Sequence, residues 1–534
     1  AMPIDCISFR DTAYASKLIC DYVEKHPELQ PFYSHYPTLE NFKPQVDAKK
    51  AEFSTEKRAV LVSALMQQYA KLMPSKHITS RIESLAKQNT FTVTTGHQLN
   101  LLGGPLYFLY KIITTINLAK ELKVKDPNNN YIPVFWMATE DHDFEEINHF
   151  NFHNKRFQWS KKTSGAVGLL ETSELSELIN VFSNVLGKTT HAKVLLELVK
   201  NAYLNHSNLA DATRYLVHAL FEGDNLLVID GNDSSLKRLF IPVVATELSS
   251  SHAFKFISQT SEKLKEIDKN YKIQVNPRQI NLFYLKGNLR ERIVLSEGIY
   301  RVLNTQLSWD LKGVLEELNL YPERFSPNVI MRPLYQETIL PNLCYIGGGG
   351  ELSYWLQLKT YFESEKLNFP ILLHRNAVLL VHQKQQQKLD KLNVSALDLF
   401  QSKQALIDSQ LKKISKIPID FSEQKATLRR QFSTLYKVAS QTDKSFMGAV
   451  AAQEKKQMNG LEALEKRLLK AEKKSHKNYI ERLEQIHLEL FPNGSLQERF
   501  SNVSEFYLDY GDEFIDRLKL ELAPLNQNFY IFSL

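Results

Sequence analysis

The chain has 534 residues, of which 43% are hydrophobic and 24% are charged. These fractions are typical of folded globular proteins and exclude the disordered, collagen-like and disulfide-scaffold classes. The 66 Lys and Arg residues nearly balance the 60 Asp and Glu residues. The charge therefore gives no reason to expect a nucleic-acid partner and only weakly favours anionic ligands.

The cysteine content and the hydropathy of the sequence indicate the cellular compartment. Only Cys6, Cys20 and Cys344 occur, without the close spacing of a metal site, so we expect neither disulfides nor a cysteine-rich zinc site. The first residues lack a secretory pattern, and no long apolar run predicts a membrane span. These features favour a reducing, cytoplasmic location.

The first part of the chain predicts alternating strands and helices. A β-rich run at 91–95 is followed by a glycine-containing loop, a helix from Pro105 to about Leu122 and an apolar strand at 132–139, which together make a βαβ unit. A further strand at 226–231 precedes a helix at 234–240. We expect a doubly wound, Rossmann-like α/β core over residues 1–370, with inserted connecting segments.

A helical region follows the core. Between residues 371 and 490 the helix-breaking residues are Pro418, Gly448 and Gly460, and apolar residues recur at spacings of three and four. The pattern predicts an antiparallel coiled-coil arm that turns near 448–460, after which residues 491–534 return to the core. Such an arm carries a dimer interface or packs within its own chain, and the spacing does not decide between these.

Three polar clusters are candidates for a functional site, because ligands of parallel sheets bind beyond the carboxyl ends of the strands. The first cluster follows the strand at 91–95. Its glycines allow close approach of a ligand, and the following helix offers free N–H groups to an anion. We assign His97 of this cluster to catalysis, and we assign substrate binding to Thr95, Gly96, Gln98, Asn100 and Lys111. A purely structural turn, with His97 as a packing residue, is the alternative.

The second cluster follows the strand at 132–139. Glu140, Asp141, His142 and Asp143 begin a run of ten residues that holds five carboxylates and two histidines, and we assign these four to catalysis. His142 with Asp141 or Asp143 has the ligand types for Mg²⁺ or Zn²⁺, but no known metal spacing is present, so we assign no metal ligand. Part of the run is expected to cap the next helix.

The third cluster contains an arginine and a glycine tract. Arg332 offers a fork for a carboxylate or phosphate, and four glycines precede Glu351 as a possible anion cradle. We assign nucleotide binding to Gly347, Gly348, Gly349, Gly350 and Glu351, and substrate binding to Arg332, Gln336, Glu337, Tyr354 and Trp355. A glycine linker is the alternative. Cys344 is expected to be a buried small residue.

Together these motifs resemble the bacillithiol biosynthesis cysteine-adding enzyme family, BshC. The resemblance rests on Thr95–Gln98 with Gly104–Tyr107 and Lys111, on 133–136 running into 140–147, and on 325–328, 332–338, 340–341 and 347–355. Shorter matches follow at Pro492, 496–499 and 516–518. The motifs occur in the same order over nearly the whole chain, and they add Tyr107 to the expected substrate-binding residues.

The resemblance implies a Rossmann-like core related to class I nucleotidylyltransferases, with a coiled coil that makes a homodimer. It also implies a ligase that joins the carboxyl group of L-cysteine to the amine of glucosaminyl-malate. Such a carboxylate needs activation, so we expect ATP or another nucleotide as co-substrate, with no membrane or nucleic-acid partner. The alternatives are a nucleotidyltransferase for another small anionic metabolite and a nucleotide-binding scaffold without turnover.

Overall fold

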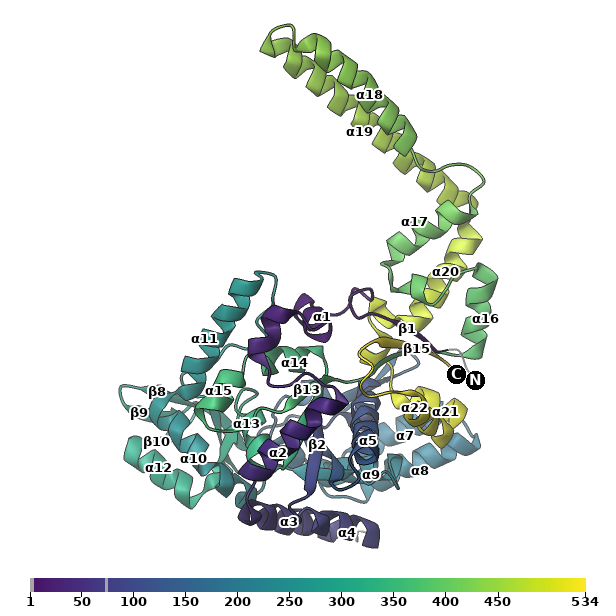
Figure 1. Cartoon of the computed structure of the whole chain (residues 1–534). Helices are drawn as coiled ribbons and strands as arrows, with labels where there is room; N and C mark the ends of the chain where they lie inside the picture. Colours follow the sequence, from purple (N-terminus) through teal and green to yellow (C-terminus); the bar gives the residue numbers. More distant parts are fainter. Residues whose placement is uncertain (1–3, 73–74) are drawn as a thin grey trace.

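The computed structural model describes residues 4–72 and 75–534, and a five-stranded parallel sheet lies at its centre (Figure 1). The spatial order is β13-β12-β2-β3-β6. Counted along the chain, these strands stand in the order 3-2-1-4-5, which is the arrangement of a doubly wound Rossmann-like fold. The bounds are β2 Thr90–His97, β3 Asn130–Met137, β6 Leu227–Asp230, β12 Asn342–Gly347 and β13 Ile371–His374.

The strands are buried on both faces, which explains their apolar sequences. In β3, Ile132, Val134 and Trp136 enter one core, whereas Phe135 and Met137 enter another on the opposite face. This alternation follows from the two-residue repeat of a strand. The predicted strands and the βαβ unit are confirmed.

Helices cover both faces of this sheet (Figure 1). α5 (Tyr107–Lys125) packs on β2 and β3, and α3 (Thr55–Tyr69), α10 (Ser234–Ser250) and α13 (Arg332–Ile339) contribute to the core on the other face. The helix predicted from Pro105 begins two residues later, at Tyr107. The N–H of the preceding Leu106 donates to the carbonyl of Ser501, outside the helix.

A second, antiparallel sheet is inserted between α10 and α13. Its order is β10-β9-β8-β7-β11, and it carries one wall of the site described below. The bounds are β7 Leu282–Lys286, β8 Leu289–Ser296, β9 Ile299–Val302, β10 Ser308–Trp309 and β11 Phe325–Pro327. Inserted segments were expected here from the sequence, but this sheet was not predicted.

A third sheet joins the two ends of the chain to the start of the arm. β15 (Phe529–Ser533) lies between β1 (Ile4–Ile7) and β14 (Ala377–Val381), so the N- and C-terminal ends are close together (Figure 1). The segment after the arm also contributes α21 (Val503–Tyr510) and α22 (Asp512–Glu521), which pack on α8 and α5.

The helical arm projects from this sheet (Figure 1). α16 (Gln383–Leu392), α17 (Lys403–Ile414) and α20 (Lys477–Leu490) form its base, and α18 (Ser422–Ala439) packs along α19 (Lys444–Ser475) in an outer hairpin. The predicted turn near 448–460 is wrong: the turn occupies 440–443, and both Gly448 and Gly460 lie inside α19. One helical glycine costs only about 1 kcal/mol, whereas Asp443 caps α19 by accepting from the N–H of Phe446.

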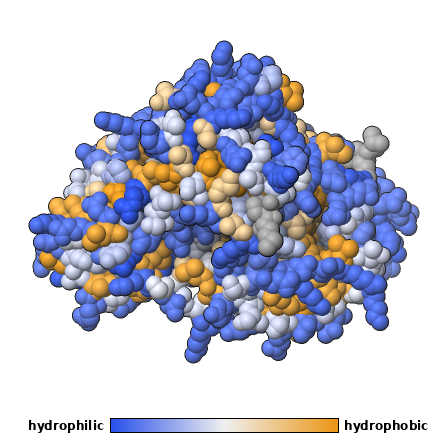
Figure 2. Space-filling view, turned by 90° about the horizontal axis from the view of Figure 1, so that it is seen from below, coloured by the Kyte–Doolittle hydropathy of each residue, from blue (hydrophilic) through white to orange (hydrophobic). Residues whose placement is uncertain are grey.

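The remaining elements surround the sheets. They are α1 Lys17–Val23, α2 Phe42–Glu52, α4 Lys76–Ser84, α6 Phe144–Ile147, β4 His149–Phe152, β5 Lys155–Gln158, α7 Leu175–Leu186, α8 Thr190–Leu204, α9 Leu209–Leu220, α11 His252–Ile267, α12 Leu311–Leu320, α14 Gly349–Trp355 and α15 Lys359–Ser364. Among the described residues, no helix combines the length and hydropathy needed to cross a membrane. The face seen from below is mostly hydrophilic, with scattered apolar groups (Figure 2).

Candidate functional site

A cavity of about 690 Å³ opens at the carboxyl ends of β2, β3 and β12. Neighbouring strands β2 and β12 are followed by connections that run to opposite sides of the sheet, and such a switch point is where doubly wound folds bind ligands. The cavity brings together all three predicted clusters. The predicted residues that line it are Gly96, His97, Gln98, Tyr107, Lys111, Glu140, Asp141, His142, Asp143, Arg332, Gly348, Gly349, Gly350, Glu351 and Tyr354.

His97 ends β2 and is held as a neutral ring. Its Nε2 lies 3.1 Å from the carbonyl oxygen of Gly103, which can only accept, so Nε2 carries the proton. Burial, with the nearby charge of Lys111, lowers the pKa of His97 to about 3. At neutral pH this imidazole can contact a substrate, but it is not a charged acid.

Lys111 and Glu351 form an ion pair at the back of the cavity. Lys111 Nζ lies 2.7 Å from Glu351 Oε2 and also donates to the carbonyl of Gly96. Burial lowers the pKa of Lys111; burial opposes the charge of Glu351 too, but Lys111 and the hydroxyl of Tyr345 hold the Glu351 pKa below its usual value. Both charges are therefore neutralised within the protein.

The carboxylate of Glu351 binds the backbone of the glycine tract that precedes it. The N–H of Gly348 donates to Glu351 Oε2 at 2.8 Å, so this carboxylate occupies the start of α14, where the sequence analysis placed a nucleotide. Gly347 is needed for close approach, because a Cβ there would lie 3.0 Å from the ring of Tyr345. Gly348, Gly349 and Gly350 still line the cavity, but the predicted cradle is at least partly filled from within.

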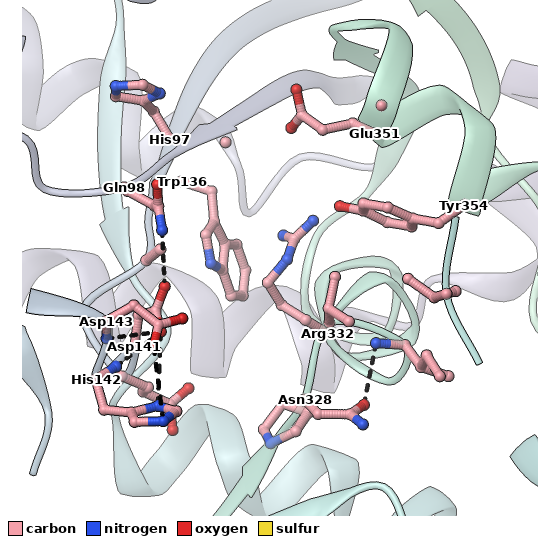
Figure 3. A pocket seen from close by; sticks show the side chains of 18 of the residues that line it. His97, Gln98, Trp136, Asp141, His142, Asp143, Asn328, Arg332, Glu351 and Tyr354 are labelled. Atoms are coloured by element: carbon pink, nitrogen blue, oxygen red, sulfur yellow. Dashed lines mark hydrogen bonds and ion pairs between the residues drawn. The ribbon is translucent and has the colours of Figure 1, made fainter. Parts of the chain in front are cut away.

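Arg332 stands at the centre of the cavity (Figure 3). It begins α13, its guanidinium lies 5.7 Å from the ring centres of both Trp136 and Tyr345, and it donates to Gln336 at 3.2 Å. Burial opposes its charge, but the neighbouring Tyr345 and Tyr354 raise its pKa above the ordinary value. Within the described chain it has no carboxylate ion-pair partner, so it is free to bind an anionic ligand.

The acidic cluster lies across the cavity from Arg332 (Figure 3). Glu140 is engaged by Lys237 of α10, whose ammonium also donates to the carbonyl of Phe325 at 2.8 Å. Asp141 accepts from Gln98 Nε2 at 3.1 Å and from the backbone N–H of His142 at 2.7 Å. With a third bond from the N–H of Asp143, three donors position Asp141, while one-quarter of its side chain stays exposed.

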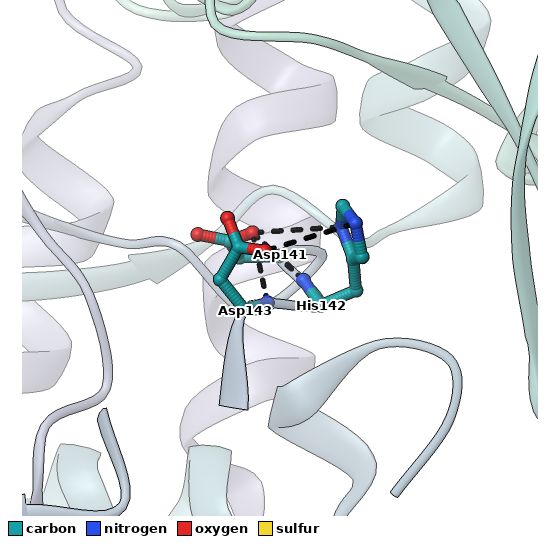
Figure 4. A group of neighbouring side chains, drawn as sticks. All are labelled: Asp141, His142 and Asp143. Atoms are coloured by element: carbon teal, nitrogen blue, oxygen red, sulfur yellow. Dashed lines mark hydrogen bonds and ion pairs between the residues drawn. The ribbon is translucent and has the colours of Figure 1, made fainter. Parts of the chain in front are cut away.

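The same cluster has the geometry of a small metal site. One ligand atom each from Asp141, His142 and Asp143 lies within 4.8 Å of the others (Figure 4). However, Arg290 of β8 donates to His142 Nδ1, and an arginine cannot accept, so this nitrogen is already used as an acceptor. The absence of a metal ligand from the assigned site stays a prediction.

Six residues assigned to the site lie outside the cavity lining: Thr95, Asn100, Gln336, Glu337, Gly347 and Trp355. The side chains of Gln336 and Trp355 contact residues of the lining instead. Gln336 accepts from Arg332, and Trp355 stacks on Tyr345 with ring centres 4.7 Å apart. Glu337 is fully buried and faces Lys49 at 3.9 Å, away from the cavity.

Sequence reasoning missed several cations of the site. Arg375 lines the cavity and forms a buried, bidentate ion pair with Glu498, at 2.9 and 2.8 Å. Arg290 and Arg292 line it from β8 of the inserted sheet, and Arg278 lines it from the segment that leads to β7. The Arg-x-Arg spacing of Arg290 and Arg292, which places both side chains on one face of a strand, was the available signal.

Two family descriptions match almost the entire chain. "Bacillithiol biosynthesis BshC, N-terminal Rossmann-like domain" matches residues 2–376, and "Bacillithiol biosynthesis BshC, C-terminal coiled-coil domain" matches residues 378–534. The chain belongs to the BshC family. The resemblance found in the sequence motifs is thereby confirmed, and the junction of the two matched regions falls at the start of β14.

Curated BshC relatives match over the full length. Proteins from Flavobacterium johnsoniae, Flavobacterium psychrophilum and Christiangramia forsetii are 53%, 51% and 49% identical to this chain. The alignments cover 100% of this chain and 100%, 100% and 99% of the respective relatives. Each relative is named "Putative cysteine ligase BshC".

Proposed function

We propose that this BshC-family protein is a ligase that joins the carboxyl group of L-cysteine to the amine of glucosaminyl-malate, forming bacillithiol. The observation that carries the proposal is Arg332, a half-buried arginine at the centre of the switch-point cavity that has no carboxylate ion-pair partner among the described residues. Its fork suits a carboxylate of the malyl group. The names of the full-length relatives support cysteine as the second substrate.

Amide formation needs an activated cysteine carboxylate, and we propose ATP as the activator. In the adenylation form of this reaction, a carboxylate oxygen attacks the α-phosphorus and pyrophosphate leaves. The amine then attacks the acyl carbon, the C–N bond forms and AMP leaves with the electron pair of the broken C–O bond. Attack at the γ-phosphorus would instead release ADP and then phosphate, so the nucleotide product distinguishes the two routes.

The amine of glucosaminyl-malate must lose a proton before or during its attack. We propose Asp141 as the base, because Glu140 is held by Lys237 whereas Asp141 is partly exposed to the cavity. The donor Gln98 fixes the orientation of the Asp141 carboxylate. His97 contacts the bound substrate as a neutral ring.

We also propose that the arm joins two copies of the chain in the cytoplasm. The outer hairpin exposes the apolar side chains of Leu435, Val438, Phe446 and Leu464, which a second hairpin would cover. Among the described residues, none of the outer hairpin lines the cavity. Each copy would therefore hold a complete site.

A product assay tests the proposal. The purified protein is incubated with glucosaminyl-malate, cysteine and ATP, and bacillithiol, AMP and ADP are measured by mass spectrometry. We expect bacillithiol with one equivalent of AMP or ADP, loss of product in Arg332→Gln, and normal turnover in Arg301→Gln, an exposed arginine of β9 outside the cavity. No thiol product with any nucleotide would reject the ligase, and an adenylylated metabolite formed with pyrophosphate but without thiol would indicate a nucleotidyltransferase.

A further inference from the structure

The inserted sheet places three arginines on one wall of the cavity. Arg290 and Arg292 belong to β8, and Arg278 lies in the segment that leads to β7. We call Arg278, Arg290 and Arg292 the arginine wall. The registers Phe283↔Arg292 and Leu285↔Arg290 put the two β8 arginines on the same face of the sheet.

The arginine wall is only partly compensated by the protein: the carboxylates of Glu140, Asp141 and Asp143 lie near Arg290 and favour its charge, but at more than ion-pair distance. In the part of the chain that the structure describes, none of its guanidinium groups forms an ion pair, whereas Lys111, Arg375 and Lys237 are each paired with a glutamate. Burial lowers the pKa of Arg292, and the nearby charge of Arg278 lowers it further. The repulsion between Arg278 and Arg292 is unfavourable, and a bound polyanion would relieve it.

The arginine wall is also held in place from behind. The guanidinium of Arg290 lies 3.9 Å from the ring centre of Phe283 and donates to His142. The backbone of Arg278 is fixed by Asn281, whose side chain accepts from its N–H at 3.0 Å and donates to its carbonyl at 2.7 Å. Arg290 Nε is buried and has no hydrogen-bond partner in the described part of the chain. The guanidinium of Arg290 is therefore fixed in place, and a fixed donor loses little freedom when a ligand binds.

We propose that the arginine wall binds the triphosphate chain of a nucleoside triphosphate inside the same cavity that binds the other substrates. Several neighbouring guanidinium forks match a chain of phosphate oxygens, whereas a single carboxylate would engage only one fork. The cavity of about 690 Å³ is within the range of sites that hold drug-sized ligands. This inference deepens the proposed function, on which its role in activating cysteine rests.

Binding measurements without cysteine or glucosaminyl-malate test the arginine wall directly. The probes are ATP, inorganic tripolyphosphate and tricarballylate, titrated into the full-length protein by calorimetry at two salt concentrations. The variants are Arg278→Gln, Arg292→Gln and their double variant, with Arg301→Gln of β9 as the matched control. Both Arg278 and Arg292 retain solvent contact, so we expect all variants to melt within a few degrees of the wild type.

We expect the dissociation constants of ATP and tripolyphosphate to rise about tenfold for each wall arginine removed, with a shallower salt dependence. Arg301→Gln should bind both probes like the wild type. Unchanged binding in the double variant, an equal loss in Arg301→Gln, or tighter binding of tricarballylate than of tripolyphosphate would overturn the proposal. These titrations measure binding and not product formation. They can therefore reject the triphosphate site without rejecting the ligase, and the product assay can reject the ligase without rejecting the triphosphate site.

Discussion

The cavity has cations of two kinds, and their environments differ. Lys111 and Arg375 line the cavity from the core and are paired with Glu351 and Glu498, as Lys237 behind them is paired with Glu140. Arg332 and the arginine wall have no such partner among the described residues. Cationic residues of one cavity can therefore have different roles. The paired cations stabilise the structure of the site, and the unpaired cations are available to bind ligands.

The paired cations should matter most for stability. Replacing Glu498 by Gln leaves the buried charge of Arg375 without its partner, and breaking such a pair costs about 3–5 kcal/mol. The free energy of unfolding, measured by urea denaturation, should fall by this amount. The double variant Arg375→Met/Glu498→Leu should lose less stability than Glu498→Gln, because it leaves no unpaired charge buried. A single variant as stable as the wild type would contradict the structural role of the pair.

Arg332 should matter for turnover and little for stability. Arg332→Gln removes the charged fork from the cavity, and we expect kcat/KM to fall about 100-fold in the product assay. Arg332→Lys keeps the charge but loses the bidentate geometry, so it should recover only part of the activity. Unchanged kinetics in the Gln variant would show that this unpaired cation does not bind substrate.

A third case is the buried but loosely matched pair of Glu337 and Lys49. Their charged atoms are 3.9 Å apart, and burial raises the pKa of Glu337 to about 7. A carboxyl group whose folded pKa exceeds its unfolded value stabilises the fold at low pH, and this contribution disappears as the pH rises from about 4.5 to 7. The wild type should therefore lose about 2 kcal/mol more stability than Glu337→Gln between pH 5 and pH 8. Parallel pH profiles of the two proteins would refute this.

The outer hairpin should matter least for the chemistry. Replacing the exposed Leu435 and Leu464 by lysine places charge on the proposed dimer face, and light scattering should show a change from dimer to monomer. Because no described residue of the outer hairpin lines the cavity, kcat/KM per chain should change less than twofold. A large loss of activity on dissociation would show that the partner completes the site.

The elements that lie close in sequence to an apolar strand could be predicted. The strand at 132–139 and the acids that follow it identified one edge of the cavity, and Arg332 was recognised from its motif. The capping of the glycine tract was also readable, because Gly348 and Glu351 have the spacing of a helix-capping pair. It was missed because a phosphate cradle has the same composition.

Other features of the site depend on tertiary structure and could not be predicted from local sequence patterns. Arg375 meets Glu498 across 123 positions of the chain, and no local pattern connects them. The arginine wall exists because β7 pairs with β8 and the inserted sheet folds back over the carboxyl ends of the core strands. The position of Glu337, on the buried side of α13, depends on how that helix packs, which its sequence alone did not determine.

The most direct test of the two kinds of cation is a crossed binding experiment. Glucosaminyl-malate and ATP are titrated separately into the wild type, Arg332→Gln and Arg278→Gln/Arg292→Gln. We predict that Arg332→Gln weakens the binding of glucosaminyl-malate and leaves the binding of ATP unchanged. The double variant should weaken the binding of ATP and leave the binding of glucosaminyl-malate unchanged. If both variants weakened the same ligand, or neither ligand responded, the assignment of separate ligands to Arg332 and the arginine wall would be contradicted.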